Sequence, residues 1–335
     1  MTRSLLLLLA TAAAVAASYS QYHQTANLLI GGEGGWDYFE VYSDSGRVFI
    51  PRDSHIQVLD GQLKLIADIS GVDGAHAIVF APDLKKAFLS TDASVSVLDI
   101  ASMKITAKTA LAGKDPDAIL YDKFSHRVFT FNGGGTEDAT AVDALTGKIV
   151  GNINLGGKPE TAQTDGEGHI FVNIEDKSKI ADFDASTLKL LHEWPLAPCQ
   201  TPAGLAIDTA HKRLFVGCRN QLMAMVDYTN GKVVATLPIG KGDDANRFDP
   251  ATGLAFASCG DGTITVAHED SPDHLTVVQT IQTKPGARTM ALDSRTHKVY
   301  TVTAKFGPPP APTKENPHPY PSLVPNTFAA LAFAQ

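Results

Sequence analysis

Residues 114–157, KDPDAILYDKFSHRVFTFNGGGTEDATAVDALTGKIVGNINLGG, contain four short runs in which apolar and polar side chains alternate. This alternation predicts β-strands at 118–121, 127–131, 139–142 and 149–155, because successive side chains of a strand point to opposite faces. Turn-forming residues separate the runs, as in LTGK at 145–148. A four-stranded meander of this length cannot bury both of its faces alone, so we expect copies of it to pack on either side.

The rest of the chain supplies these copies. In each copy the second strand carries an apolar pair whose last member is aromatic, namely Phe49, Phe88, Phe129, Phe171, Phe215, Phe256 and Tyr300. These anchors recur every 39 to 44 residues, which is the spacing typical of β-propeller blades with four strands each. Seven anchors therefore predict an all-β, seven-bladed β-propeller of antiparallel strands.

The two ends of the chain predict how the ring closes. Residues 22–32 resemble the predicted fourth strands at 63–71 and 149–157, whereas the last repeat provides strands at 289–292, 298–302 and 327–333. The N-terminal strand is therefore expected to join the last blade, which would hide two exposed strand edges. Residues 19–335 would then form one domain, with the Pro-rich stretch 307–326 as a loop inside the last blade.

The first 18 residues differ from the repeats. Arg3 precedes an apolar run at 5–17 that is rich in Ala and Leu and too short to span a membrane. This pattern predicts a cleaved signal peptide at 1–18 and a periplasmic or secreted protein with no membrane span after cleavage. The alternative is a buried first helix.

The net charge limits the kinds of partner that the protein can bind. The formal net charge is -8 at pH 7 with no cluster of basic residues, so we expect no nucleic-acid partner.

The chain contains three cysteines, Cys199, Cys218 and Cys259. Cys199 precedes the first strand of the fifth repeat and Cys218 ends its second strand, so the hairpin brings both to one end. We predict a disulfide between them, with Cys259 free; three buried thiols are the alternative.

The strongest functional signal is a ring of ionisable residues. The innermost strand of every propeller blade lines the central channel, and these strands are expected to begin at Asp37, His76, Asp117, Glu160, Ala203, Asp244 and Arg288. Crowded carboxylates and an imidazole suit a divalent metal ion, for which we name Asp37, His76, Asp117, Glu160 and Asp244 as candidate ligands. Without a metal, one carboxyl group should be protonated and available as a general acid or base. The alternative is a solvated channel lining.

Loops on the same face add two further candidates. Arg52 and Arg219 carry guanidinium groups that can clamp a carboxylate or phosphate group of a ligand. The loop at 307–326 is expected to cross the channel mouth as a stiff lid with His318 and Tyr320 as contacts, or else to be a solvated insertion. The Trp36-Asp37-Tyr38 triplet is a candidate for ligand stacking, and packing in the core is the alternative for Trp36.

The repeats RVFTFNGG (127–134), HIFVNIEDKS (169–178), RLFVGCRN (213–220) and KVYTVTA (298–304) resemble those of the YVTN-type, YncE-like β-propeller proteins, a WD40/YVTN repeat-like group. The resemblance covers nearly the whole mature chain and implies a secreted seven-bladed ring, but no single activity. The strict YVTN tetrapeptide is absent, the nearest form being YTVT at 300–303, and there is no CxxCH motif for haem attachment.

Three functions follow from the ring. The first is binding of a small ligand or metal ion at the channel mouth by Asp37, His76, Asp117, Glu160, Asp244 and Arg288, together with Arg52 and Arg219. The second is a metal-assisted hydrolase or lactonase in which His76, Glu160 or Asp117 moves the proton. The third is a protein-interaction scaffold. No G-x-S-x-G elbow, phosphate loop or dinucleotide fingerprint occurs, so enzymes built on those motifs are excluded.

Overall fold

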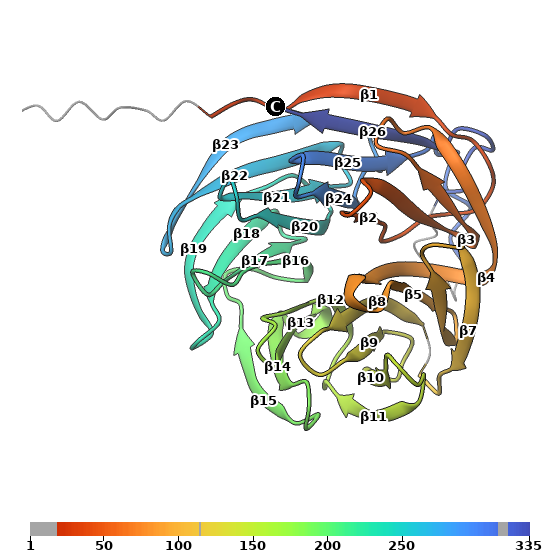
Figure 1. Ribbon diagram of the computed structural model, residues 1–335. Coiled ribbons are helices and arrows are strands. Elements are labelled where there is room, and N and C mark those ends of the chain that lie inside the picture. Colours follow the sequence, from red (N-terminus) through yellow and green to blue (C-terminus); the bar gives the residue numbers. More distant parts are fainter. Residues whose placement is uncertain (1–18, 114, 314–320) are drawn as a thin grey trace, which may run out of the picture.

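The computed structural model describes residues 19–113, 115–313 and 321–335, and the predicted signal peptide lies outside them. In these ranges the chain is almost entirely β-strand, with short 3-10 turns at Pro82–Leu84 and Glu175–Lys177. Twisted antiparallel sheets stand side by side around a central axis, as in a β-propeller (Figure 1). None of the described residues belongs to a helix that is long and apolar enough to cross a membrane.

The strands form six sheets. The first contains β2 (Glu40–Tyr42), β3 (Arg47–Leu59), β4 (Leu65–Ala81), β5 (Lys86–Thr91), β6 (Ser94–Asp99) and β7 (Lys104–Ala110). The next two contain β8 (Pro116–Asp122), β9 (Arg127–Asn132), β10 (Asp138–Asp143) and β11 (Ile149–Asn154), and then β12 (Pro159–Thr164), β13 (His169–Ile174), β14 (Lys179–Asp184) and β15 (Leu190–Pro195). The last three contain β16 (Pro202–Asp208), β17 (Arg213–Cys218), β18 (Leu222–Asp227) and β19 (Lys232–Pro238); β20 (Asp243–Asp249), β21 (Leu254–Cys259), β22 (Thr263–Ser271) and β23 (His274–Gln282); and β24 (Met290–Asp293), β25 (Lys298–Thr303), β26 (Ala329–Ala334) and β1 (His23–Leu29).

The prediction of seven separate four-stranded blades is therefore wrong. Six sheets form, because the first and second repeats share a single six-stranded sheet. β4 runs without a break from the outer edge of the first repeat into the second, and Asp53 of β3 pairs with Ala75 of β4 across the expected boundary. The segment 71–74 stays in the strand while bending at Gly71 (φ 91°) and Gly74 (φ 70°), where the other repeats have a loop.

Ring closure by the N-terminal strand is confirmed. β1 pairs antiparallel with β26, from His23 opposite Ala334 to Leu29 opposite Ala329. The last sheet therefore has the order β1-β26-β25-β24 and contains strands from both ends of the described chain (Figure 1). This pairing covers the edge of β26, and β1 becomes the outer strand of the last sheet.

The aromatic anchors form the core between sheets. All seven are at most 2% exposed. Phe129 of one sheet lies 5.5 Å from Phe183 of the next, measured between ring centroids, and Phe171 lies 4.8 Å from Tyr228 in the same way. Contacts of this kind stabilise a sheet only when a neighbour covers its face, so each sheet depends on the next. Trp36 belongs to the same core, since it packs against Phe306 and Phe328.

The disulfide is also confirmed. Cys199 and Cys218 are bonded, their Cα atoms lie 5.8 Å apart, and Cys259 is free and buried. The bond links the entry of β16 to the end of β17, so it closes a loop with a sequence separation of 19 residues.

Removing the disulfide should lower the free energy of unfolding by about 3 kcal/mol, because the cross-link restricts the unfolded chain. The double variant Cys199→Ala/Cys218→Ala, compared with the wild type in urea without reductant, measures this loss. Cys259→Ala, which leaves the disulfide intact, is the control for loss of a buried sulfur atom. Equal midpoints for the double variant and the wild type would contradict the expectation.

Candidate functional site

A β-bulge marks the start of the innermost strand in five repeats. The pairing register slips between Ala75 and Ala77, Pro116 and Ala118, Pro159 and Ala162, Pro202 and Leu205, and Asp243 and Ala245. The residues skipped include His76, Asp117, Glu160, Ala203 and Asp244, which are the predicted ring positions of those repeats. A bulge re-aims the side chain of the extra residue, so the repeated irregularity places these five residues at one end of the channel.

Asp37, His76 and Asp117 form the first part of this mouth. Each offers one ligand atom, and these three atoms lie within 4.8 Å of one another. All three residues are partly exposed, so the cluster is open to solvent. Nε2 of His76 also lies 3.3 Å from Asp92 and 3.9 Å from Asp115, so two further carboxylates surround the imidazole.

The crowding of carboxylates raises their pKa values. Burial raises the pKa of Asp37 well above its usual range, and the charges of Asp117 and Asp244 add to this, while Arg288 opposes it. Burial also raises the pKa of Asp117, with a further contribution from Asp115 and opposition from His76. The part of each shift that comes from neighbouring carboxylates, as distinct from burial, indicates that a positive charge among these groups would be favourable.

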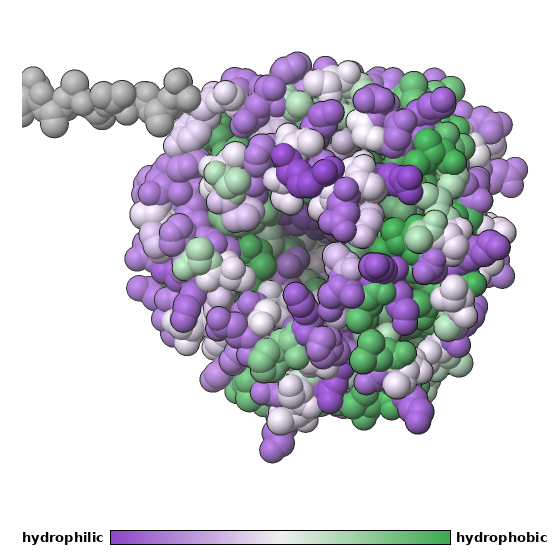
Figure 2. Space-filling view, viewed as in Figure 1, coloured by the Kyte–Doolittle hydropathy of each residue, from purple (hydrophilic) through white to green (hydrophobic). Residues whose placement is uncertain are grey.

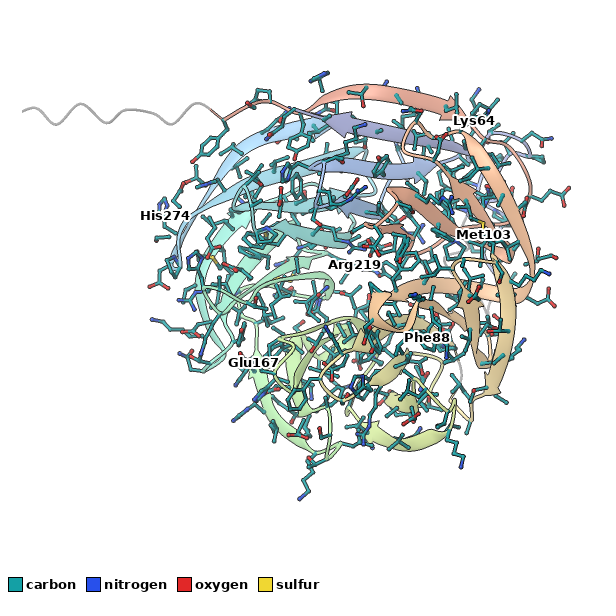
Figure 3. All side chains as sticks on the ribbon, in the orientation of Figure 1. Lys64, Phe88, Met103, Glu167, Arg219 and His274 are labelled. Carbon is teal, nitrogen blue, oxygen red and sulfur yellow. A yellow bond between two sulfur atoms is a disulfide. The ribbon has the colours of Figure 1, made fainter. Side chains whose placement is uncertain are left out.

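An ion-pair network forms the other part of the mouth. Nζ of Lys158 lies 3.2 Å from Oε1 of Glu160 and 2.7 Å from Oε2 of Glu175. Arg219 connects these groups to Asp244 of β20. Its Nε lies 3.2 Å from Glu175, and its Nη2 lies 3.5 Å from both Glu160 and Asp244. Arg219 is at the centre of the ring in Figure 3.

Arg288 links the two parts. Its Nε donates to Oδ2 of Asp244 over 2.6 Å, and its Nη2 lies 3.6 Å from Oδ1 of Asp37. The ring predicted from the start of the innermost strands is therefore a connected cluster, in which Ala203 is the one member without an ionisable side chain.

Burial raises the pKa values of two further carboxyl groups near the mouth. Burial raises the pKa of Glu160 to about 9, Asp117 and Glu175 raise it further, and Lys158 opposes the shift. Burial raises the pKa of Asp243 to about 8, and its Oδ1 has no hydrogen-bond partner among the described residues. Asp243 fits because Gly217 has no side chain: a Cβ there would lie 2.0 Å from Oδ2 of Asp243.

Arg52 does not join the mouth. It is 1% exposed, and its guanidinium donates to backbone carbonyl groups of the segment 31–35 and to Oε1 of Gln57 over 2.6 Å. The same group lies over the ring of Phe328 at 3.7 Å. These contacts tie the segment after β1 to the first sheet, so Arg52 has a structural role here.

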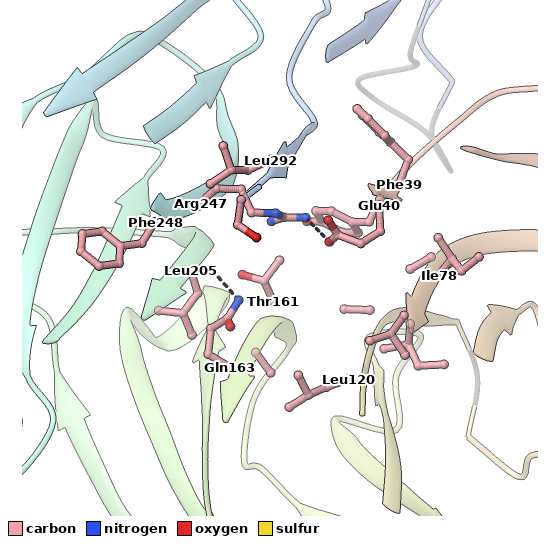
Figure 4. A pocket seen from close by; sticks show the side chains of 17 residues that line it. Phe39, Glu40, Ile78, Leu120, Thr161, Gln163, Leu205, Arg247, Phe248 and Leu292 are labelled. Carbon is pink, nitrogen blue, oxygen red and sulfur yellow. Dashed lines mark hydrogen bonds and ion pairs between the residues drawn. The ribbon is translucent and has the colours of Figure 1, made fainter. Parts of the chain in front are cut away.

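Below the mouth, the channel contains a cavity of about 310 Å³ lined by the innermost strands (Figure 4). Nη2 of Arg247 lies 2.9 Å from Oε2 of Glu40 in this cavity, and Nε2 of Gln163 donates to the carbonyl of Leu205. Tyr38 spans the two regions, since it lines the cavity and its hydroxyl donates to the Asp244 carbonyl over 3.3 Å. The hollow at the centre of Figure 2 has both hydrophilic and hydrophobic residues around it.

Sequence reasoning missed several members of the site. Lys158 lies two positions and Asp243 one position from a predicted ring residue, and that spacing is the signal that could have found them. Glu175 lies in the loop that follows β13, where no spacing marks it. The contacts of the lid residues His318 and Tyr320 lie outside the described residues.

No family model and no curated protein sequence matches the chain. A chain in the crystal structure of a mitotic checkpoint complex is similar in structure, with a TM-score of 0.73 over 90% of this chain and 95% of that one. The two sequences are 12% identical, so this likeness shows the fold alone. The class of the protein is that of the β-propellers, whose channel mouth here carries a cluster of carboxylate, imidazole and guanidinium groups.

The raised pKa of Glu160 predicts a pH dependence of stability. Between the ordinary value of 4.5 and about 9, the folded state keeps a proton that the unfolded state loses, so the free energy of unfolding falls as pH rises. Glu160→Gln stays neutral and should gain on the wild type by up to about 1.4 kcal/mol per pH unit within this window. Urea unfolding with chelator at pH 5, 7 and 8.5 measures this, with the exposed Glu167→Gln as control. Parallel curves for Glu160→Gln and the wild type would contradict the assignment.

Proposed function

We propose that the protein binds a divalent metal ion at the channel mouth through Asp37, His76 and Asp117, and a small ligand beside it. The observation that carries the proposal is the convergence of three ligand atoms, from three separate repeats, within 4.8 Å. Two carboxylates and one imidazole suit Zn²⁺, Mn²⁺ or another transition metal better than Ca²⁺, which prefers oxygen ligands alone.

Electrostatics supports a cation at this position. The charge of Asp117 disfavours the ionised form of Asp37. Among the ion pairs between described residues, one guanidinium group, that of Arg288, reaches this pair, at 3.6 Å from Asp37. A metal ion would remove this repulsion while leaving positions for water or a ligand, because the cluster is partly exposed.

A neighbouring cavity supports the small ligand. It has a volume of about 230 Å³ and lies beside Arg219, Asp244 and Arg288, with Phe306 and Pro321 as apolar walls. Because Arg288 also reaches Asp37, a molecule in this cavity would lie near the proposed metal ion. The combination of guanidinium groups and an apolar wall suits a small organic acid or ester.

A second candidate function is hydrolysis of lactones or esters. The observation that favours it is Glu160, whose pKa of about 9 makes it a proton donor at neutral pH. A metal ion held by Asp37, His76 and Asp117 would polarise the carbonyl group, and a water molecule would add to the carbonyl carbon. As the bond from that carbon to the leaving oxygen breaks, the Glu160 carboxyl group would give its proton to the leaving oxygen and would regain one from the water that has added.

The proposal also includes a secreted or periplasmic location and a relationship to the YVTN-type propeller proteins. A disulfide that links β16 and β17 suits an oxidising compartment, and with the apolar stretch at 5–17 it supports secretion or a periplasmic location. The repeat elements support the resemblance to YVTN-type propeller proteins. A protein partner on the same face is the outcome to pursue if neither metal nor small ligand binds.

The metal proposal predicts near-stoichiometric uptake of Mn²⁺ or Zn²⁺ that depends on the mouth. His76→Ala and Asp117→Asn should each lower the affinity at this site by about tenfold or more, because each removes a direct ligand. Equilibrium dialysis with inductively coupled plasma mass spectrometry measures the binding, and Asp73→Asn, an exposed carboxylate on the same strand as His76, is the control. No difference between the mouth variants and the control would overturn the proposal.

The hydrolysis candidate predicts turnover of simple γ- and δ-lactones by the metal-loaded protein. Glu160→Gln should reduce kcat by at least about 100-fold while metal uptake stays unchanged, because only the proton donor is lost. Glu167→Gln serves again as control. Turnover that is equal in Glu160→Gln and the wild type would exclude this role for Glu160.

A further inference from the structure

A second cluster of metal-ligand type lies at the opposite end of the innermost strands. β16 begins at the mouth and ends at Asp208, and His211 lies in the turn between β16 and β17. Glu269 comes from β22 of the next sheet. The three residues therefore join two neighbouring sheets, and none of them belongs to the site described above.

The geometry brings one ligand atom from each residue together. Nδ1 of His211 lies 2.7 Å from Oδ2 of Asp208 and 3.4 Å from Oε1 of Glu269. The three ligand atoms all lie within 4.8 Å of one another. Oδ1 of Asp208 accepts from the backbone N–H of Ala210 over 2.9 Å, which stabilises the turn. The second oxygen, Oδ2, faces the cluster.

Glu269 supplies an independent indication of a missing ligand. The residue is 8% exposed, and its buried Oε1 makes no hydrogen bond of good geometry to a described residue, although Nδ1 of His211 lies 3.4 Å from it. A buried acceptor without a good hydrogen bond is unfavourable, so a bound group at this position would offset a real penalty. The ligand oxygens of Asp208 and Glu269 lie within 4.8 Å of each other, so the two carboxyl groups repel each other when both are ionised.

The nearby cation does not relieve this repulsion. Arg213 directs its guanidinium to Asp273 at 3.0 Å, to Asp227 at 3.4 Å and to backbone carbonyl groups. Among the described residues, the ion pairs of Asp208 and Glu269 are with His211 alone.

We propose that Asp208, His211 and Glu269 form a second binding site for a divalent metal ion of the Zn²⁺ class, which links the fourth and fifth sheets named above, β16–β19 and β20–β23. Two carboxylate oxygens and one imidazole nitrogen match the ligand set of Zn²⁺. The site is separate from the channel mouth and does not depend on the function proposed there.

The cluster can accept such an ion with a small adjustment. Ligand bonds of about 2.0–2.2 Å in tetrahedral geometry place ligand atoms roughly 3.3–3.6 Å apart. The separation of 3.4 Å between His211 and Glu269 already fits, whereas the 2.7 Å between His211 and Asp208 must open slightly. The side chain of His211 is 52% exposed and lies in a turn, so it has room to move and leaves a coordination position for water.

The test uses a background in which the mouth cannot bind metal, namely His76→Ala/Asp117→Asn. Zn²⁺ uptake is measured by equilibrium dialysis at pH 7.5, and thermal unfolding is measured with and without Zn²⁺. We expect about one Zn²⁺ per chain and a rise in Tm, since a ligand that binds the folded state stabilises it. Adding His211→Ala should lower the affinity by at least about tenfold and abolish the rise in Tm.

The matched control is His274→Ala, an exposed histidine on β23 whose Nδ1 lies 2.9 Å from Asp270. Because His211 is exposed, its variant should keep the fold, which circular dichroism checks; Glu269→Gln in the same background removes a second ligand. Absence of Zn²⁺ uptake in the background protein would overturn the proposal. Uptake that His211→Ala and Glu269→Gln leave unchanged would overturn it equally, since the ion would then lie elsewhere.

Discussion

The bulge at the start of the innermost strand is the feature on which the channel mouth depends. A regular antiparallel pair would direct alternate residues into the packed faces between sheets, where an ionised side chain is costly. The slip between Ala75 and Ala77, and its counterparts in four other repeats, takes one residue out of this alternation. Each repeat can therefore present a charged residue at the mouth without disturbing the apolar core around its aromatic anchor.

The mouth is electrostatically uneven around the ring. Its charges come from the bulge positions and from neighbouring loop residues, and they differ from repeat to repeat. Asp37, His76 and Asp117 come from the start of the order of repeats, whereas Arg219 and Arg288 come from its second half. The cations pair with Glu160, Glu175 and Asp244. The acidic side that contains His76 therefore has fewer cationic partners than the other side.

The fold and the ring could be predicted from the sequence because both repeat. The anchors such as Phe129 mark the period, and counting back from them reaches Asp117 and its equivalents. The number of sheets could not be predicted this way, because the link between Asp53 and Ala75 is a backbone pairing that leaves no residue pattern. The role of Arg52 was also hidden, since its partners are carbonyl groups of the segment 31–35. The cluster at Asp208 needed a contact between sheets, which no spacing along one strand reveals.

Pairing of β1 with β26 has a consequence for biosynthesis. The contact joins His23 to Ala334, so it cannot form until nearly all of the described chain has been made. A chain emerging from the ribosome therefore holds an open arc with unpaired edges, and the loop that must close is one of the longest the chain allows. Folding to the closed ring is a late event, which leaves a long interval in which chaperones can meet an incompletely folded chain.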